Sequence, residues 1–522
     1  VELDEETYRW VYEATMGYPA MIVALGKLVS AGFNPKEVVE RGVLDGIIGK
    51  ILKTLDAYEY ESLVAASVFL STPTIKEVES IARIGGVDIY LRKLARKGII
   101  QIIGDSVIIH DALKSFIERN ESKKTKRYHK TLAQILLDQM SGESVFRAFY
   151  HLFKAEDYVA ALEVIEEARK MNLAIPENYH MLYREILDSI PYAKLPSHYR
   201  LLLVYNRAMA MDGKESITLL ENLLSESQLA EDKIVYLRAL VGLAFKLFKM
   251  GDDKYLEYLD KAFFAAENWA DPLDSRFFVT LIWLLHKAGN IRKAEKVATR
   301  YLSLASSYHE KAYAHHFLAI IYETCGKLEL ALRHIDEAIS NYLKTPILYN
   351  LAVAYNDKGY ILYNLGEHDQ ALIFLEKAYK TADIASYSYV KASSLIDMAE
   401  VYVSLPDPEK TSERINYVEK NFSEILDREP SLKGRILFVK ARLSTLQGNL
   451  GEADYYFTIA ASKLEKTHKY HYARCLLFHS FLSATMDKKK ACRLAQKACQ
   501  IYTKFENKSL MEKALNVINE TC

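Results

Sequence analysis

The stretch that decides the fold runs from residue 359 to 378 and reads GYILYNLGEHDQALIFLEKA. A Gly-Glu turn in the middle separates an aromatic, apolar segment from a second segment that carries Ala371, Leu375 and Ala378. Positions i, i+4 and i+7 lie on one face of an α-helix, so these three residues form a narrow stripe. The pattern predicts two antiparallel helices joined by a glycine turn.

The same turn recurs along the C-terminal part of the chain. The glycines stand 38, 38, 37, 40 and 82 residues apart, at Gly213, Gly251, Gly289, Gly326, Gly366 and Gly448. The gap of 82 residues holds two periods, because a proline-containing turn at 405–408 replaces one glycine. A last turn, at 487–490, precedes the final unit. Fixed periods of about 20 to 50 residues are typical of solenoids, and each glycine is expected to end the first helix of its pair in a left-handed conformation.

The stripe of small residues also recurs after the turns. It reads Ala294/Ala298/Tyr301, Ala331/Ile335/Ala338, Ala371/Leu375/Ala378, Ala453/Phe457/Ala460 and Ala491/Ala495/Ala498. Gly359, Gly366, Ala371, Leu375 and Ala378 resemble signature positions of a tetratricopeptide repeat (TPR), whose usual period is about 34 residues. The longer period of this chain implies longer helices. We therefore predict a mainly α protein in which residues 201–522 form a TPR-like α-solenoid superhelix.

If the first helix of each pair lines the concave face of this superhelix, the alignment selects a set of residues for a partner-binding groove. They are Arg276, Trp283, His286, Tyr313, His316, Glu323, Asn356, Tyr360, Tyr363, Arg435 and Arg442. Aromatic residues and arginine are enriched at binding hot spots. Because the chain has 36 tyrosines, any one of them can equally be a packing residue between helices.

Residues 56–120 have a different pattern, in which three helical segments precede two β-branched runs joined by Gly104-Asp105. This order resembles a winged-helix domain with a small β-hairpin. The third helix carries Arg92, Lys93, Arg96 and Lys97, and residues 83–130 hold twelve Lys/Arg against five Asp/Glu. The charge makes these four residues candidates for DNA binding. The alternative is a protein–protein module whose charges are solvated.

Two short motifs flank the winged helix: Gly17-Tyr18-Pro19 in a helical segment, and His110-Asp111 after the hairpin. With the order of domains, they resemble the signal-transducing ATPases with numerous domains (STAND), a family that includes the bacterial maltose-regulon activator. The resemblance implies a helical lid over residues 1–55 with a Gly-x-Pro motif, and a helical connector with degenerate first repeats over 121–200. It also implies that Pro19 packs on the adenine of ADP and that His110 contacts the β-phosphate. From the residues alone, Asp111 is equally a helix cap and Pro19 a helix-start proline.

The chain lacks the phosphate-binding loop G-x-x-x-x-G-K-S/T, and no catalytic or metal-binding constellation is recognisable in its sequence. We therefore expect no enzymatic activity from this chain. Binding of ADP or ATP would require a nucleoside-triphosphatase module upstream of Val1, where the sequence opens abruptly without methionine. The sequence is expected to be the C-terminal part of a longer protein, which could oligomerise.

Composition limits the other classes of function. Lys plus Arg equals Asp plus Glu at 68 each, so no overall attraction to nucleic acid or membrane follows. Five cysteines without a CxxC pair indicate a reduced, cytoplasmic protein. Scarce glutamine indicates, weakly, a thermophilic source. No apolar run is long enough to span a membrane.

Three functions remain open at this stage. The first is the regulatory, sensor part of a STAND ATPase, in which a protein, peptide or small effector on the superhelix controls an ADP-closed to open switch. The second is a transcription regulator whose winged helix binds DNA while the repeats receive the signal. The third is a TPR protein-interaction scaffold without a nucleotide.

Overall fold

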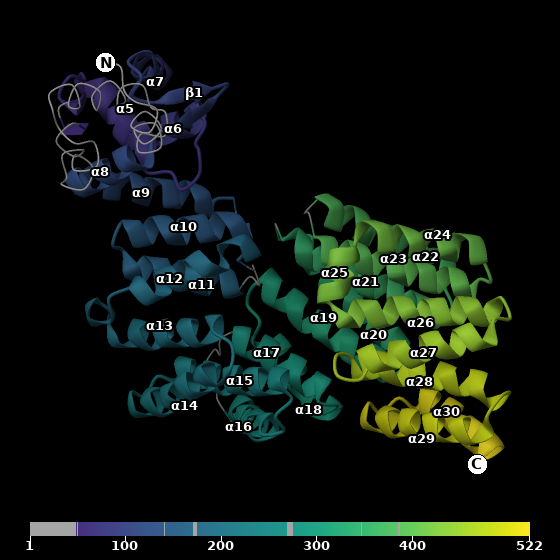
Figure 1. Ribbon diagram of the computed structural model, residues 1–522. Helices are drawn as coiled ribbons and strands as arrows, with labels where there is room; N and C mark the ends of the chain where they lie inside the picture. Colours follow the sequence, from purple (N-terminus) through teal and green to yellow (C-terminus); the bar gives the residue numbers. More distant parts are fainter. Residues whose placement is uncertain are drawn as a thin grey trace, which may run out of the picture. The chain divides into compact units, whose positions relative to one another are not determined.

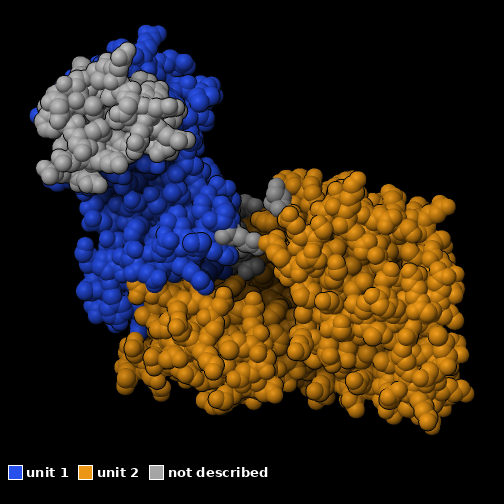
Figure 2. Space-filling model, in the orientation of Figure 1, with its two compact units in different colours: residues 1–203 blue, residues 204–522 orange. Residues whose placement is uncertain are grey.

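The computed structural model describes residues 48–49, 51–139, 141–170, 175–268, 275–345, 347–384 and 387–522. Contacts divide the chain into two compact units, residues 1–203 and 204–522 (Figure 2). The fold is mainly α with one small β-hairpin, which confirms the predicted fold class (Figure 1). No helix within the described ranges is long and apolar enough to cross a membrane.

The first unit contains the expected three helices and hairpin. The helices are α5 (Ala57–Ser67), α6 (Ile75–Ala82) and α7 (Val87–Arg96). Strands β1 (Gln101–Ile103) and β2 (Ser106–Ile108) pair antiparallel, with Ile102 opposite Val107. An isolated bridge from Thr74 to Ser106 ties the start of α6 to the hairpin. This arrangement matches the winged-helix prediction.

The rest of the first unit is a run of helices. They are α8 (Asp111–Asn120), α9 (Ser122–Leu137), α10 (Gly142–Lys154), α11 (Tyr158–Lys170) and α12 (His180–Ser189), with short 3-10 turns at Glu177–Tyr179 and Tyr192–Lys194. Helix α13 (Ser197–Ala210) spans the division between the two units.

The second unit is a TPR-like superhelix of antiparallel helix pairs (Figure 1). After α14 (Lys214–Leu229), the first helices of the pairs are α15 (Lys233–Met250), α17 (Ser275–Lys287), α19 (Tyr308–Thr324), α21 (Leu348–Leu365), α23 (Ser388–Ser404), α26 (Pro430–Leu446) and α28 (Lys469–Ala484). Their partners are α16 (Tyr255–Asn268), α18 (Ile291–Leu304), α20 (Leu328–Tyr342), α22 (His368–Ile384), α24 (Pro408–Asn421), α27 (Leu450–Leu464) and α29 (Lys488–Lys504). A short α25 (Ser423–Arg428) is inserted after α24, and α30 (Lys508–Thr521) ends the array.

The glycine turns end the first helices as predicted, with one exception. Gly366 is the C-cap of α21 at φ 86°, in the left-handed region that other residues avoid. Gly251 ends α15 in the same way. Gly213 differs, because its φ of 83° is combined with a ψ of −167° and it stands at the N-cap of α14. The prediction of a left-handed helix end is therefore wrong at Gly213, where the residue starts the second helix instead of ending the first.

The predicted stripes are the buried seams between helices. Every residue of the five stripes is at most 3% exposed. The approach is close at Gly359 of α21, where a Cβ atom would lie 2.7 Å from Leu375 Cγ and 3.2 Å from the Ala371 carbonyl oxygen. The signature glycine and the stripe are therefore two sides of one contact between α21 and α22.

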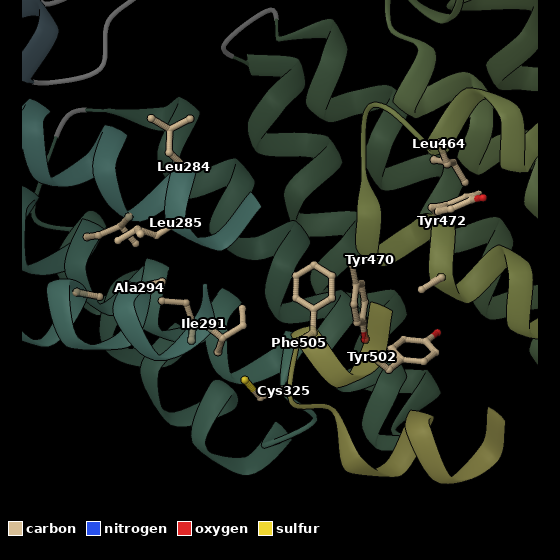
Figure 3. Packing of buried hydrophobic residues seen from close by; sticks show 14 of the residues in the cluster. Leu284, Leu285, Ile291, Ala294, Cys325, Leu464, Tyr470, Tyr472, Tyr502 and Phe505 are labelled. Atoms are coloured by element: carbon tan, nitrogen blue, oxygen red, sulfur yellow. The ribbon is translucent and has the colours of Figure 1, made fainter. Parts of the chain in front are cut away.

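The superhelix closes on itself, because its last repeat returns to contact the turns after α17 and α19. Asn507 donates from Nδ2 to the Thr324 carbonyl at 2.9 Å. Arg292 Nε lies 2.7 Å from Glu506 Oε1. In one continuous buried cluster, Phe505 lies beside Tyr470 and faces Ile291 and Cys325 (Figure 3). The sequence pattern predicts the repeats but contains no sign of this closure.

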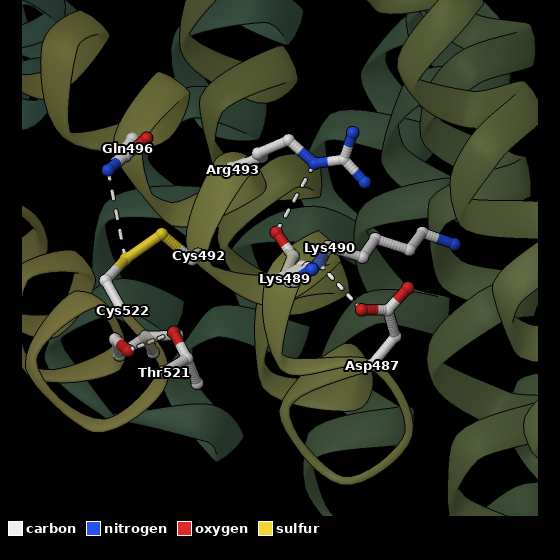
Figure 4. Close-up of a disulfide and its surroundings, with 9 residues drawn as sticks. Asp487, Lys489, Lys490, Cys492, Arg493, Gln496, Thr521 and Cys522 are labelled. Atoms are coloured by element: carbon white, nitrogen blue, oxygen red, sulfur yellow. Dashed lines mark hydrogen bonds between the residues drawn. A yellow bond between two sulfur atoms is a disulfide. The ribbon is translucent and has the colours of Figure 1, made fainter.

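A disulfide joins Cys492 of α29 to Cys522 at the chain end (Figure 4). Gln496 Nε2 lies 3.8 Å from Cys522 Sγ. The cysteines were expected to be reduced, and this disulfide contradicts that expectation for Cys492 and Cys522. Only the packing of α30 on α29 brings the two residues together, and their separation of 30 residues gave no hint of it.

Candidate functional site

A cavity of about 260 Å³, called here the central cavity, lies within the second unit. Its walls come from α17, α19, α21, α23, α26 and α28, which are all first helices of their pairs. The lining residues are Trp283, His286, Lys287, Phe317, Ile320, Ile321, Glu323, Thr324, Val353, Asn356, Asp357, Tyr360, Ile361, Tyr389, Val390, Ser393, Asp397, Ser431, Arg435, His468, Tyr470 and His471. The helices that the alignment assigned to the concave face therefore line one cavity.

The structure brings together about half of the predicted groove residues in this lining. Those that line the cavity are Trp283, His286, Glu323, Asn356, Tyr360 and Arg435. Those outside the lining are Arg276, Tyr313, His316, Tyr363 and Arg442. The periodic alignment selected the correct helices, but it could not give the rotation of each helix about its own axis.

Of the residues outside the lining in α17 and α19, His316 contacts it. His316 Nε2 lies 2.7 Å from Asp357 Oδ2, and Asp357 lines the cavity. Tyr313 is buried and donates to Asn350 Oδ1 at 3.2 Å. Arg276, in the first turn of α17, is half-buried away from the cavity. Tyr313 is therefore a packing residue, and Arg276 is not part of the lining.

One wall of the cavity is organised around Asp397 of α23, which is 2% exposed. It forms an ion pair with Arg435, and it accepts a hydrogen bond from Asn356 Nδ2 at 2.9 Å. Ser394 donates to Asn356 Oδ1 at 2.7 Å, which fixes the orientation of the amide. Arg435 also donates from a terminal nitrogen to Ser393 Oγ at 2.9 Å. A buried carboxylate held by an arginine and an amide is fixed in place.

A second buried carboxylate, Glu400, lies one helical turn further along α23. Arg474 lies 2.6 Å from Glu400 Oε1 and Arg442 lies 3.5 Å from the same atom. Burial alone would raise the pKa of Glu400, but these arginines hold that pKa below its ordinary value. Arg442 also donates to Tyr363 at 3.0 Å, and Arg474 donates to Tyr360. Tyr363 and Arg442 therefore brace the wall that holds Tyr360.

Asp397, Glu400 and Arg474 were not predicted from the sequence. A signal existed for the two acids, because α23 reads SYVKASSLIDMAEVYVS and is otherwise almost entirely apolar or small. Carboxylates on a helix that is buried all round need partners. Arg474 gave no comparable signal, because its hydrogen-bond partner Tyr360 and its ion-pair partner Glu400 lie more than 70 residues earlier in the chain.

Another part of the lining is rich in histidine. His286 Nε2 lies 2.8 Å from Thr324 Oγ1, and burial lowers the pKa of His286 to about 3. Burial also holds the pKa values of His468 and His471 well below the ordinary value. Burial raises the pKa of the Glu323 carboxyl to about 8, although Asn364 Nδ2 donates to it at 3.0 Å. At neutral pH this part of the cavity consists mainly of uncharged hydrogen-bonding groups.

In the first unit, His110 rather than Asp111 is the N-cap of α8. Its Nδ1 accepts a hydrogen bond from the Ala112 amide at 3.1 Å. The cap role weighed for Asp111 is therefore wrong, and Asp111 is the first helical residue. Gly17 and Pro19 lie outside the described residues. Burial lowers the pKa of His110.

The basic residues proposed for DNA binding lie on α7, and most are engaged within the domain. Arg92 Nε lies 2.8 Å from Asp88, and Lys97 Nζ lies 2.6 Å from the buried Glu59. Lys93 lies over the Tyr90 ring, 5.3 Å from its centroid. Arg96 is exposed. The net positive charge is present, but much of it is balanced locally.

Three solved structures are similar to this chain. A STAND protein with a tetratricopeptide repeat sensor, from Pyrococcus horikoshii, is 14% identical at a TM-score of 0.43, over 99% of this chain and 69% of that one. A Rap protein complexed with competence and sporulation factor is 14% identical at a TM-score of 0.47, over 73% of this chain and 99% of that one. The Cut9–Hcn1 hetero-tetramer of the APC/C is 13% identical at a TM-score of 0.42, over 99% of this chain and 93% of that one.

No protein-family model matches the sequence, and no curated protein matches it. The chemistry of the site therefore rests on the residues of this chain. Within the described ranges, no group of three or more His, Cys, Asp or Glu is arranged to hold a metal ion.

Proposed function

We propose that this protein is a sensor whose superhelix binds a small polar effector or the end of a peptide in the central cavity. The observation that carries the proposal is the set of six first helices converging on one cavity lined by aromatic and fixed polar side chains. Ligand sites are typically concave, largely apolar and equipped with a few well-oriented polar groups. The chain is thus assigned a binding role and no catalytic one.

The size of the cavity favours a small effector over a folded protein. Its volume of about 260 Å³ lies just below the ~300 to 1,000 Å³ usual for small-ligand pockets. A stable protein–protein interface instead buries about 800 Å² on each partner, mostly on open surface. An effector that enters the cavity must therefore be compact, or must insert only one end of a longer chain.

The chemistry of the lining favours an effector with hydrogen-bond acceptors. Among the described residues, the buried Arg435 Nε has no hydrogen-bond partner, although its terminal nitrogens are engaged. A buried donor left without a partner costs about 1 to 3 kcal/mol. A peptide carbonyl or carboxylate oxygen beside Arg435 would recover that cost, and Trp283 and Tyr389 would cover its apolar parts.

We further propose that the sensor belongs to a STAND-type regulator in which effector binding controls an ADP-closed to open switch. This rests on the sequence motifs and on the order winged helix, connector and superhelix. Because Nδ1 of His110 accepts the Ala112 amide proton, the ring proton of neutral His110 lies on Nε2, the tautomer that can donate to a phosphate. ADP would be bound only with an upstream nucleoside-triphosphatase module, and His110 would then hold its β-phosphate.

The other two functions are less well supported. DNA binding through α7 would have to compete with the ion pairs of Arg92 and Lys97. A scaffold for folded proteins would not require a concave cavity backed by buried charges. Both therefore rank below effector sensing.

A matched pair of tyrosine variants tests the proposal. Tyr389 lines the cavity and Tyr417 does not, yet each is 43% exposed, so truncation should affect folding similarly. Thermal-shift screening of the chain with a pool of dipeptides to pentapeptides should identify at least one stabilising peptide. Tyr389→Ala should lose that stabilisation and Tyr417→Ala should keep it. Equal responses of the two variants would place binding elsewhere.

A further inference from the structure

A second cavity in the superhelix is lined by lysines and contains no acidic residue. It is called here the lysine crevice, has a volume of about 260 Å³, and is bordered by Phe248, Tyr255, Lys287, Ala288, Gly289, Lys466, Thr467, Lys469, Ile501, Lys504 and Phe505. Four of its eleven lining residues are lysines, and none is Asp or Glu. A chain with equal numbers of acidic and basic residues offers no general reason for such a local excess.

The four lysines come from three separate parts of the repeat array. Lys287 ends α17, Lys466 and Lys469 flank the loop into α28, and Lys504 ends α29. The crevice thus lies along the closure between the last repeat and the turn after α17. The Cβ of Lys504 lies 3.4 Å from the position of a Cβ on Gly289, so the two sides are in contact there.

These lysines lack carboxylate partners. Among the described residues, none of the four forms an ion pair within 4 Å. Glu506 is the acid next to the crevice in sequence, and it is engaged by Arg292 at 2.7 Å. Lys287 lies instead over the Trp283 ring, 5.9 Å from its centroid, and burial lowers the pKa of its ammonium to about 8.

Like charges that face one space repel each other, and water screens this repulsion least at Lys287, because Lys466, Lys469 and Lys504 are exposed. Here the repulsion acts across the closure and opposes it. A multivalent anion in the crevice would replace this repulsion with attraction, because each lysine would then face an opposite charge. Lysine is well suited to phosphate as a compact point charge on a flexible stem.

We propose that the lysine crevice is a binding site for a small phosphate-class polyanion that clamps the closed form of the superhelix. The site is distinct from the effector site of the central cavity, although Lys287 borders both. The aromatic rings of Phe248, Tyr255 and Phe505 complete its walls. The polyanion stabilises the fold because it binds only when the two ends of the array meet.

Titration calorimetry with inorganic triphosphate tests the site on the full chain. The double variant K466Q/K504Q should weaken binding at least tenfold. The control K488Q/K489Q removes the same charge from exposed lysines at the other end of α29, and should weaken binding less than twofold. Raising the salt concentration should weaken binding to the parent chain, and orthophosphate, with fewer charges, should bind more weakly than triphosphate.

A second readout tests the clamp. Hydrogen exchange of the amides at 288–291 and 505–507, which lie on the two sides of the closure, should slow when triphosphate is added. The inference is overturned if the parent chain does not bind triphosphate, or if K488Q/K489Q weakens binding as much as K466Q/K504Q. It is also overturned if binding leaves exchange at the closure unchanged, because the anion would then not bridge the two ends.

Discussion

Asn507 donates a hydrogen bond from its side-chain amide to the backbone carbonyl of Thr324, 2.9 Å away and 183 residues earlier in the chain. The same side chain caps α30 by accepting from the Leu510 amide at 3.1 Å. One residue thus starts the last helix and holds it to the turn after α19. This contact is one of those that hold the last repeat against the turns after α17 and α19.

The closure can be weakened without removing the helix cap. Asn507→Ser keeps an oxygen that can cap α30 but is too short to reach Thr324. Because Thr324 is 2% exposed, its carbonyl would lose a buried partner, and unfolding free energy should fall by about 1 to 3 kcal/mol. Urea denaturation measures the change. Asp487→Ser, at the exposed cap of α29, is the control and should lower the unfolding free energy by less. Equal losses of unfolding free energy in the two variants would show that Asn507 acts only as a helix cap.

The contact between Gly359 and Leu375 gives a second prediction. An added methyl group would meet Leu375 Cγ at 2.7 Å, so Gly359→Ala should destabilise the protein by about 1 to 3 kcal/mol through overpacking. Gly451→Ala is the matched control, because nothing lies within 4 Å of its Cβ position and helix propensity favours alanine. The midpoint temperature of thermal unfolding should therefore fall for Gly359→Ala and rise for Gly451→Ala. A stabilising effect of Gly359→Ala would contradict the close approach of α21 and α22.

The buried pair of Asp397 and Arg435 is predicted to be asymmetric under mutation. Asp397→Leu leaves the guanidinium of Arg435 buried without its counter-charge, which typically costs about 3 to 5 kcal/mol. Adding Arg435→Met should restore most of the lost stability, because both buried charges are then removed. Unfolding free energies of the two single variants and the double variant form the test. Additive losses in the double variant would mean that the two residues do not interact.

These residues show what the sequence could and could not predict. The stripe of Ala371, Leu375 and Ala378 was readable because it depends only on the local helical period. The contact of Asn507 with Thr324 was not, because the small curvature of each repeat must accumulate over the whole array before the ends meet. The apolar sequence of α23 signalled that Asp397 needs a partner, but it could not show that this partner is Arg435 from another repeat. Local periodicity thus predicts the repeats. The positions of the cavity and of the closure depend on the superhelical geometry of the whole array.

The Glu323 carboxyl predicts a pH dependence. Burial raises its folded pKa to about 8 from the ordinary value of 4.5, so between those values the folded protein binds more protons than the unfolded chain. The Glu323 contribution to stability is therefore full below pH 4.5 and is lost as the pH rises towards 8, at up to about 1.4 kcal/mol per pH unit.

Glu323→Gln removes this contribution. The unfolding free energy of the variant, relative to that of the parent chain, should therefore increase as the pH rises from 5 to 8. Urea denaturation at several pH values measures the difference. Glu424→Gln, at an exposed position of α25, should follow the parent profile. If the Glu323→Gln variant also follows that profile, the carboxyl is already ionised in the folded protein.

Filling the central cavity is the most direct test of the account. Val353 lines the cavity and is only half-buried, so Val353→Trp should occupy the effector volume while far-UV circular dichroism stays unchanged. Titration calorimetry of the full chain with the best peptide from the thermal-shift screen is the measurement. We predict that Val353→Trp lowers the affinity at least tenfold. Unchanged affinity in a folded Val353→Trp variant would contradict the claim that the effector binds in the central cavity.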